Sequence, residues 1–95
     1  MSESKSAQAA SSVTASEAHN GAVNQVLDVT GLPCPMPLLK AKLALNQMAV
    51  GERIKVLATD PGSIRDFASF ISLSDHTMVE SHTHEEPYTY IIERG

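Results

Sequence analysis

The residue best suited to chemistry is Cys34, the only cysteine among the 95 residues of the chain. It lies in the run Gly31-Leu32-Pro33-Cys34-Pro35-Met36-Pro37, immediately before a helical pattern. Pro35 has a fixed φ and no backbone N–H, which suits the first position of a helix, so we expect Cys34 at the helix cap. Free N–H groups and the positive end of the helix dipole favour a thiolate at such a position. The sequence therefore predicts a lowered pKa for Cys34 and a nucleophilic sulfur near neutral pH.

The alternative for Cys34 is an inert one, because a free cysteine often serves as a small buried apolar residue. Pro35 and Pro37 favour the reactive interpretation, since they fix the thiol at the start of the helix. A single cysteine excludes an intramolecular disulfide and any cysteine-cluster zinc or iron–sulfur site. Chemistry at Cys34 must therefore involve a second molecule, and we expect no metal and no other cofactor.

Asp60 and Pro61 are the next candidate pair, and they follow an apolar run. Asp60 suits the N-cap of a second helix and Pro61 its first position, while Ser63 and Asp66 offer an overlapping capping pair. Asp60 follows the end of one predicted strand, and Cys34 follows the end of another. We therefore expect Asp60 at the same edge of the sheet as Cys34, where it could support the thiol site. Capping is the favoured role, and the second role stays open.

Three histidines, His76, His82 and His84, raise the question of a metal site, because His82 and His84 would share one face of an extended strand. No third ligand has a helix-fixed spacing, so we interpret them as polar residues near a hairpin tip. Met36 and Met48 could similarly form a soft ligand pair, but methionine at helical spacing is typical of core filling.

The elements that must position these residues follow from the hydrophobic periodicity of the chain. We expect strands at 26–30, 53–59, 78–82 and 88–93, a helix at 36–48, and a second helix after Asp60. The last two strands should form an antiparallel hairpin. The first helix is expected to present Leu38, Ala41, Leu45 and Met48 to the core, with Leu39 and Leu43 widening its apolar surface. The second helix is expected to present Ile64, Phe67, Ala68 and Ile71.

The element order β-α-β-α-β-β predicts an α/β (α+β) fold, a two-layer sandwich of a mixed four-stranded sheet and two helices. The sequence leaves the strand order open. Residues 1–25 are rich in Ser and Ala, with hardly any large apolar residue besides Val13 and Val23, so we expect a flexible, disordered tail. A docking arm or a targeting segment is the alternative for this tail. Residues 26–95 are then the folded domain.

Composition excludes several functions. The formal net charge is −4, the sequence pI is about 5.4 and no basic run occurs, which argues against direct binding of nucleic acid. No apolar run is long enough to span a bilayer, and the start of the chain lacks the pattern of a signal peptide. We therefore expect no membrane association and a cytoplasmic location, which also suits a free thiol.

The sequence resembles the TusA/SirA-like sulfur-carrier family, and the resemblance covers Val26 to Gly95. It rests on the motif Cys34-Pro35-x-Pro37, on a following helix that carries Lys40 and Lys42, on Asp60-Pro61 before an apolar helix, and on Pro87-Tyr88-x-Tyr90 in the last strand. The resemblance implies a two-layer α/β sandwich whose Cys34 accepts sulfane sulfur as a persulfide and passes it on. Implied donors are a cysteine desulfurase or a rhodanese-like protein. Implied acceptor proteins feed tRNA 2-thiouridine synthesis, molybdenum-cofactor enzymes, and sulfur oxidation or thiosulfate use.

The chemistry of sulfur agrees with this resemblance. A thiolate attacks the outer sulfur of a donor persulfide, and the helix terminus that activates the thiol would also hold the more acidic persulfide as an anion. A thiol peroxidase or disulfide reductase would normally need a second, resolving cysteine. Such a carrier is a sulfurtransferase in the stoichiometric sense, handing one sulfur between partner proteins.

The site expected around Cys34 comprises Pro35, Pro37 and Asp60 as supporting residues. Lys40 and Lys42 are expected to contact a partner protein, although they could equally be solvated helix charges. A non-catalytic binding or regulatory module of the same fold is the alternative function. It is motivated by Met36, which stands where many relatives carry an acid, and by the acidic pair Glu85-Glu86 in the hairpin connection.

Overall fold

The computed structural model describes residues 23–95, which form one four-stranded sheet and two helices. In chain order the elements are β1 (Gln25–Asp28), α2 (Met36–Asn46), β2 (Arg53–Ala58), α3 (Gly62–Ser72), β3 (Thr77–His82) and β4 (Tyr88–Glu93). This arrangement confirms the predicted order β-α-β-α-β-β. Most of the predicted tail, residues 1–25, lies outside the described residues, and the tail stays a prediction.

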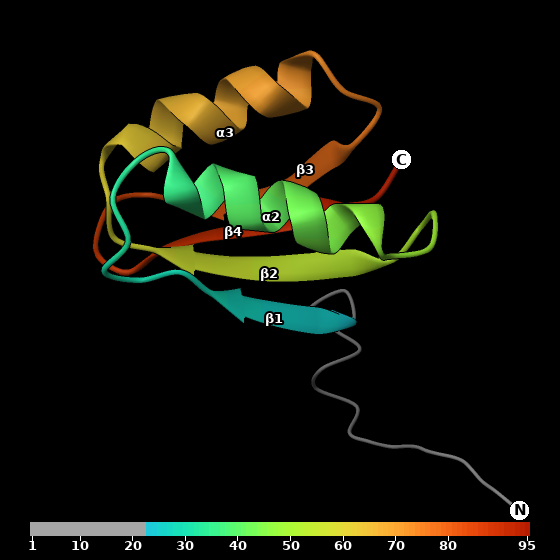
Figure 1. The fold of residues 1–95 in the computed structure, drawn as a ribbon, viewed down its shortest axis with the longest axis horizontal. Coiled ribbons are helices and arrows are strands. Elements are labelled where there is room, and N and C mark those ends of the chain that lie inside the picture. Colours follow the sequence, from blue (N-terminus) through green and yellow to red (C-terminus); the bar gives the residue numbers. More distant parts are fainter. Residues whose placement is uncertain (1–22) are drawn as a thin grey trace, which may run out of the picture.

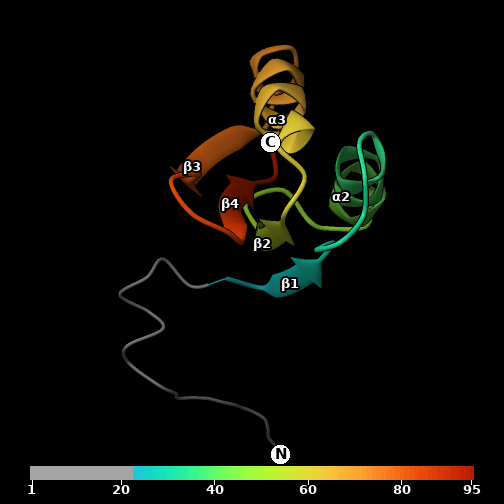
Figure 2. The same cartoon turned by 90° about the vertical axis from the view of Figure 1, so that its left-hand side faces the viewer.

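The sheet has the strand order β1-β2-β4-β3. β1 and β2 are parallel, whereas β4 is antiparallel to both of its neighbours, β2 and β3. The sheet is therefore mixed and the last two strands form an antiparallel pair, as predicted. Figures 1 and 2 show α2 and α3 on the same face of the sheet, which gives the two layers of the fold.

α2 packs on the sheet through the stripe that its periodicity predicts. Ala41 and Leu45 are fully buried, and Met48, just beyond the end of the helix, is 5% exposed. The burial of Met48 supports its interpretation as core filling. Leu39 and Leu43, by contrast, are 48% and 60% exposed, so the apolar surface that they add lies in solvent.

α3 packs on the core through a face that matches the predicted one only in part. Of its expected stripe only Phe67 is fully buried, while Ile64 is 38% exposed. Ser63, read as a polar capping residue, is 1% exposed because its hydroxyl lies 2.9 Å from the phenolic oxygen of Tyr90 in β4. The Tyr90 ring also stacks on Phe67, with ring centroids 4.5 Å apart. A buried phenol needs a hydrogen-bond partner, and this need turns Ser63 inward.

The other residues of the predicted stripe line a groove of about 300 Å³ between this helix and β3. Its lining includes Ile64, Ala68 and Ile71 from the helix and Met78 from the strand. Of the predicted stripe, Phe67 therefore enters the core, Ile71 packs against the core and also borders the groove, and the others border the groove.

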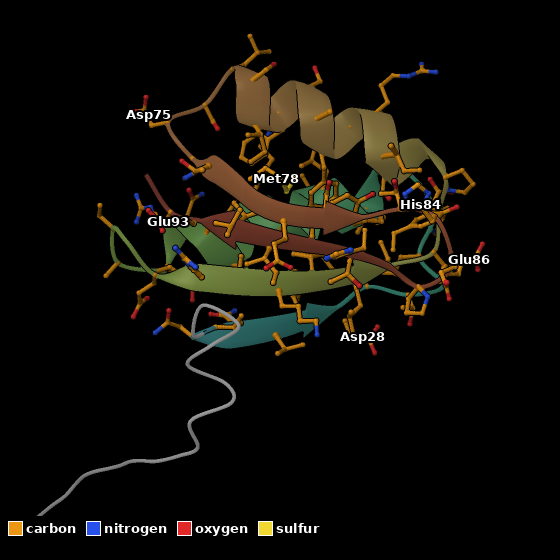
Figure 3. The ribbon with its side chains drawn as sticks, turned by 180° about the vertical axis from the view of Figure 1, so that it is seen from behind. Asp28, Asp75, Met78, His84, Glu86 and Glu93 are labelled. Carbon is orange, nitrogen blue, oxygen red and sulfur yellow. The ribbon has the colours of Figure 1, made fainter. Side chains whose placement is uncertain are left out.

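The second face of the sheet is covered by no element of the described residues. Figure 3 looks from behind, with the strands in front of α2. Polar side chains pair on these strands: the Arg53 Nε lies 3.0 Å from the Glu93 carboxylate, and the His82 Nε2 lies 3.1 Å from Glu80. Within residues 23–95, no helix is long and apolar enough to cross a membrane.

The parallel pairing of β1 and β2 decides where the chemistry is placed. Because both strands end at the same edge of the sheet, the connections to α2 and α3 leave from that edge together. Both helices also begin there, on the left of Figure 1. The turn that carries Cys34 and the turn that carries Asp60 are thereby brought side by side.

Candidate functional site

Cys34 lies exposed in the connection between β1 and α2. Gly31 supplies the positive φ, 83°, with which the chain turns away from the strand, and its N–H donates to the Thr59 hydroxyl at 2.8 Å. This bond ties the connection to the end of β2. A further turn is closed by the Met36 N–H, which donates to the Pro33 carbonyl at 2.9 Å and encloses Cys34.

α2 starts at the predicted residue, but its cap differs from the prediction, which placed Cys34 there. Pro35 occupies the cap, Met36 is the first residue of α2, and Cys34 directly precedes the cap. Pro37 lies in the first turn and is fully buried, so it packs the start of α2 against the core. Pro35 is exposed beside the thiol. Both prolines thus lie at the start of α2 next to the thiol, and their supporting role stays a prediction.

The nearest chemical neighbour of Cys34 is Asp66 on α3. The Cys34 thiol donates a hydrogen bond to Oδ2 of Asp66, with a distance of 2.8 Å between the sulfur and the oxygen. Sequence analysis missed this role and gave Asp66 only a capping function. The helical spacing could have indicated this role. Gly62 and Asp66 are four residues apart, so they lie on the same face of the helix that begins after the Asp60 turn.

This contact overturns the predicted pKa of Cys34. The hydrogen bond to Asp66 raises the pKa of the thiol above its ordinary value, with smaller contributions from desolvation and from the negative charges of Asp66 and Asp60. Arg65 opposes this shift. The prediction of a lowered pKa was wrong because it considered only the start of α2, whereas the carboxylates come from the chain around α3. A raised pKa favours the thiol form of Cys34 at neutral pH, in which the S–H donates to Asp66.

Asp60 lies beside the thiol, one residue before the N-cap of α3, which is Pro61 and not Asp60 as predicted. Its Oδ2 accepts a hydrogen bond from the Gly62 N–H at 2.9 Å. Gly62 marks how closely the two turns approach, because a Cβ at this position would lie 2.8 Å from the Asp60 carboxylate and 3.2 Å from the Cβ of Cys34. The carboxylate of Asp60 therefore accepts from an N–H at the start of α3, and its negative charge acts on Cys34. A supporting role at the thiol stays a prediction.

A groove of about 360 Å³ runs between α2 and α3 and includes Asp66 in its lining. Lys42 lines it from α2, with its Nζ 5.4 Å from the centre of the Phe70 ring. Leu73, 86% exposed, lines it near the end of α3. Lys40 is also exposed but lies outside this lining. Of the two lysines expected to meet a partner, the structure brings only Lys42 into one groove with Asp66.

His76 and His82, two of the histidines considered for a metal site, each contact another residue in the structure. His76 accepts a hydrogen bond from the Gly95 N–H at 3.0 Å, and its ring tilts against Phe70. His82 is engaged with Glu80. In the part of the chain that the structure describes, no three His, Cys, Asp or Glu side chains are grouped so that they could hold a metal ion.

The site thus consists of an exposed single thiol at the start of a helix, a carboxylate in direct contact with it, and a groove with a lysine alongside. A comparison with protein families gives a match to the model described as Sulfurtransferase TusA, over residues 25–94. The match includes every element of the sheet and both helices, and it agrees with the resemblance carried by the Cys34-Pro35-x-Pro37 motif. The chain therefore belongs to the TusA sulfurtransferase family, whose members act generally as sulfur carriers in relays between proteins.

Proposed function

We propose that Cys34 carries sulfane sulfur as a persulfide between a donor protein and an acceptor protein. The observation that carries this proposal is the exposure of the single thiol at the edge where both helices begin, where a partner can reach it. Membership of the TusA family supports a relay role. In this proposal residues 26–95 are the carrier domain, residues 1–25 are a flexible tail, and the protein acts in the cytoplasm.

The loading step balances without a cofactor. A donor persulfide R–S–S⁻ presents its outer sulfur, the Cys34 sulfur bonds to it, and the S–S bond of the donor breaks. The donor leaves as a thiol because the Cys34 proton passes to its sulfur: Cys34–SH + R–S–S⁻ → Cys34–S–S⁻ + R–SH. No electrons are gained or lost overall. The unloading step is the same exchange toward an acceptor.

In this proposal the neighbours of Cys34 have distinct supporting roles. Pro35 and Pro37 hold the connection in place, Asp60 bonds the Gly62 N–H at the start of α3 beside the thiol, and Lys42 offers a positive charge in the adjoining groove. Lys40, exposed on the same helix, adds to the positive charge available to an acidic partner surface. We propose a cysteine desulfurase or a rhodanese-like protein as the donor. The proposed acceptor serves tRNA thiolation, a molybdenum-cofactor enzyme or a sulfur-oxidation pathway.

Intact-protein mass spectrometry tests this function. The protein is incubated with a cysteine desulfurase and cysteine, or with a rhodanese and thiosulfate, and Cys34→Ser is treated in parallel. Gain of the mass of one sulfur atom, reversed by a reductant and absent from the variant, is the expected result. An unmodified protein with both donors, together with no alkylation of Cys34 at any pH, would refute the carrier function.

The binding or regulatory module stays the second candidate, and the raised pKa of Cys34 favours it, because a protonated thiol is a poor nucleophile. Cell growth under conditions that need sulfur transfer separates the two candidates. A carrier loses its function entirely in Cys34→Ser, whereas a module retains it.

A further inference from the structure

The contact between Cys34 and Asp66 has a consequence for the loaded protein, and this inference rests on the proposed carrier function. In the unloaded protein the Cys34 sulfur carries a hydrogen, which it donates to Asp66 over 2.8 Å. In a persulfide the same sulfur is bonded to Cβ and to the outer sulfur, so it carries no hydrogen. The hydrogen bond must therefore be lost whenever Cys34 is loaded.

Loading also changes the charge that Asp66 faces. A persulfide is a stronger acid than a thiol, so the loaded group is an anion near neutral pH and lies against a carboxylate. The Asp60 carboxylate adds to the repulsion, and the Arg65 guanidinium opposes it. Lys42 lines the groove with Asp66 but does not contact Cys34 or Asp66 through any hydrogen bond or ion pair of the described residues.

We propose that Asp66 biases sulfur exchange toward release, because it stabilises the unloaded thiol and destabilises the loaded persulfide. Asp66 thereby makes the protein a good sulfur donor and a weak sulfur store. A carrier that must give up its cargo benefits from such a bias, because a strongly held sulfur would stop the relay. Asp66 thus shifts the equilibrium between the Cys34 thiol and the Cys34 persulfide, whichever partner delivers the sulfur.

A small-molecule exchange tests this bias without a partner protein. The protein is equilibrated without oxygen in mixtures of glutathione persulfide and glutathione, exchange is stopped with iodoacetamide, and the loaded fraction is read by intact mass. The equilibrium is Cys34–SH + GS–S⁻ ⇌ Cys34–S–S⁻ + GSH. We expect the loading constant of Asp66→Asn to exceed that of the wild type by about three- to tenfold, given the strength of a charge-assisted hydrogen bond at an exposed site.

Two features separate this role from a merely structural one. Asp75→Asn removes the same charge at the opposite end of α3, where Figure 3 shows Asp75, and we expect the loading constant of this variant to equal that of the wild type. The advantage of Asp66→Asn should also shrink as the pH rises above the pKa of the Cys34 thiol. In that range both forms of the wild type are anions, and Asp66 repels both.

The outcomes distinguish this inference from the function on which it rests. If the wild type and Asp66→Asn load equally at neutral pH, the bias is refuted while the carrier function stands. If Asp66→Asn and Asp75→Asn both gain equally, general charge explains the effect and the specific role of Asp66 is refuted. If neither the wild type nor the two variants acquire sulfur, although all three unfold cooperatively on heating, the proposed function fails and the bias fails with it.

Discussion

The sulfur of Cys34 and the Oδ2 oxygen of Asp66 lie 2.8 Å apart, although the two residues are 32 positions apart in the chain. Their contact joins the connection before α2 to the second turn of α3, so both crossover helices contribute to the thiol site. Because β1 and β2 are parallel, no long loop is needed to bring these segments together. The reactivity of the thiol is therefore set by α3 as well as by the helix that follows the cysteine.

The pH dependence of alkylation reports this arrangement directly. We expect the rate of reaction of Cys34 with iodoacetamide to rise with a midpoint above that of an ordinary cysteine, because Asp66 and Asp60 oppose the thiolate. Asp66→Asn should move the midpoint to lower pH. Arg65→Gln should move it to higher pH, since Arg65 favours the thiolate.

Asp75→Asn is the matched control for alkylation, and its midpoint should equal that of the wild type. A midpoint of Asp66→Asn at or above the wild-type value would contradict the role of the hydrogen bond. The same result would reinstate the start of α2 as the main influence on the thiol.

The fold could be predicted from the sequence because its signals are local. The apolar spacing of Ala41, Leu45 and Met48 suffices to define α2, although the helix ends at Asn46, two residues before the predicted end. The packing face of α3 could not be predicted in the same way. The burial of Ser63 depends on Tyr90, which is 27 positions away, and a local pattern treats such a serine as a solvent-facing cap.

The position of the candidate site could also be predicted from local signals, but the electrostatic effect on the thiol could not. The motif around Cys34 located the thiol, and the Asp60-Pro61 pair located the neighbouring turn. The sign of the pKa shift was out of reach, because it needs the approach of Asp66 across the space that Gly62 leaves open. Periodicity assigns a residue to a helix face, but the neighbour of that face depends on how the helices pack.

Lys42 provides a prediction about partner recognition. We expect Lys42→Glu to slow sulfur transfer from a protein donor, because an acidic donor surface would meet a negative charge in the groove beside Asp66. Loading from glutathione persulfide should change little, since this small donor needs no docking surface. Measuring both rates at two salt concentrations checks the prediction. Equal slowing with both donors would assign Lys42 to the chemistry of the thiol instead of to docking.

The two sides of α2 provide a prediction about stability. Leu45 is fully buried, so Leu45→Ala should lower the free energy of unfolding by about 2–5 kcal/mol. Leu43 is 60% exposed, and Leu43→Ala should change the free energy of unfolding by less than about 0.5 kcal/mol. Urea unfolding followed by circular dichroism gives both values. Similar losses in the two variants would mean that α2 is rotated relative to the sheet.

Ser63 and Tyr90 should show energetic coupling. Ser63→Ala leaves the buried phenol of Tyr90 without its partner, and Tyr90→Phe leaves the Ser63 hydroxyl unpaired, so each variant should lose about 1–3 kcal/mol. The double variant removes both polar groups and should lose less than the sum of the two single losses. Thermal or urea unfolding of the four proteins measures this difference. Strictly additive losses would show that the two hydroxyls do not interact.

The titration of Tyr90 provides a prediction about the free energy of unfolding at alkaline pH. Burial raises the pKa of its phenol, which outweighs the opposing hydrogen bond from Ser63, and the charge of Tyr88 adds to the rise. Because the pKa is higher in the folded state, the folded protein holds this proton more tightly than the unfolded chain. The resulting stability is complete below the pKa of an unfolded tyrosine, about 10, and is lost as the pH rises through the folded value.

The titration of Cys34 has the same sign, since the pKa of its thiol is also raised, so the comparison is best made in Cys34→Ser. We expect the urea midpoint of Cys34→Ser to fall between about pH 9 and pH 11, and that of Cys34→Ser/Tyr90→Phe to fall less over the same range. The double variant starts from a lower stability at neutral pH because Ser63 has lost its partner. Parallel curves for the two proteins would show that the Tyr90 phenol contributes nothing to alkaline unfolding, and would assign this loss to the other ionisable groups.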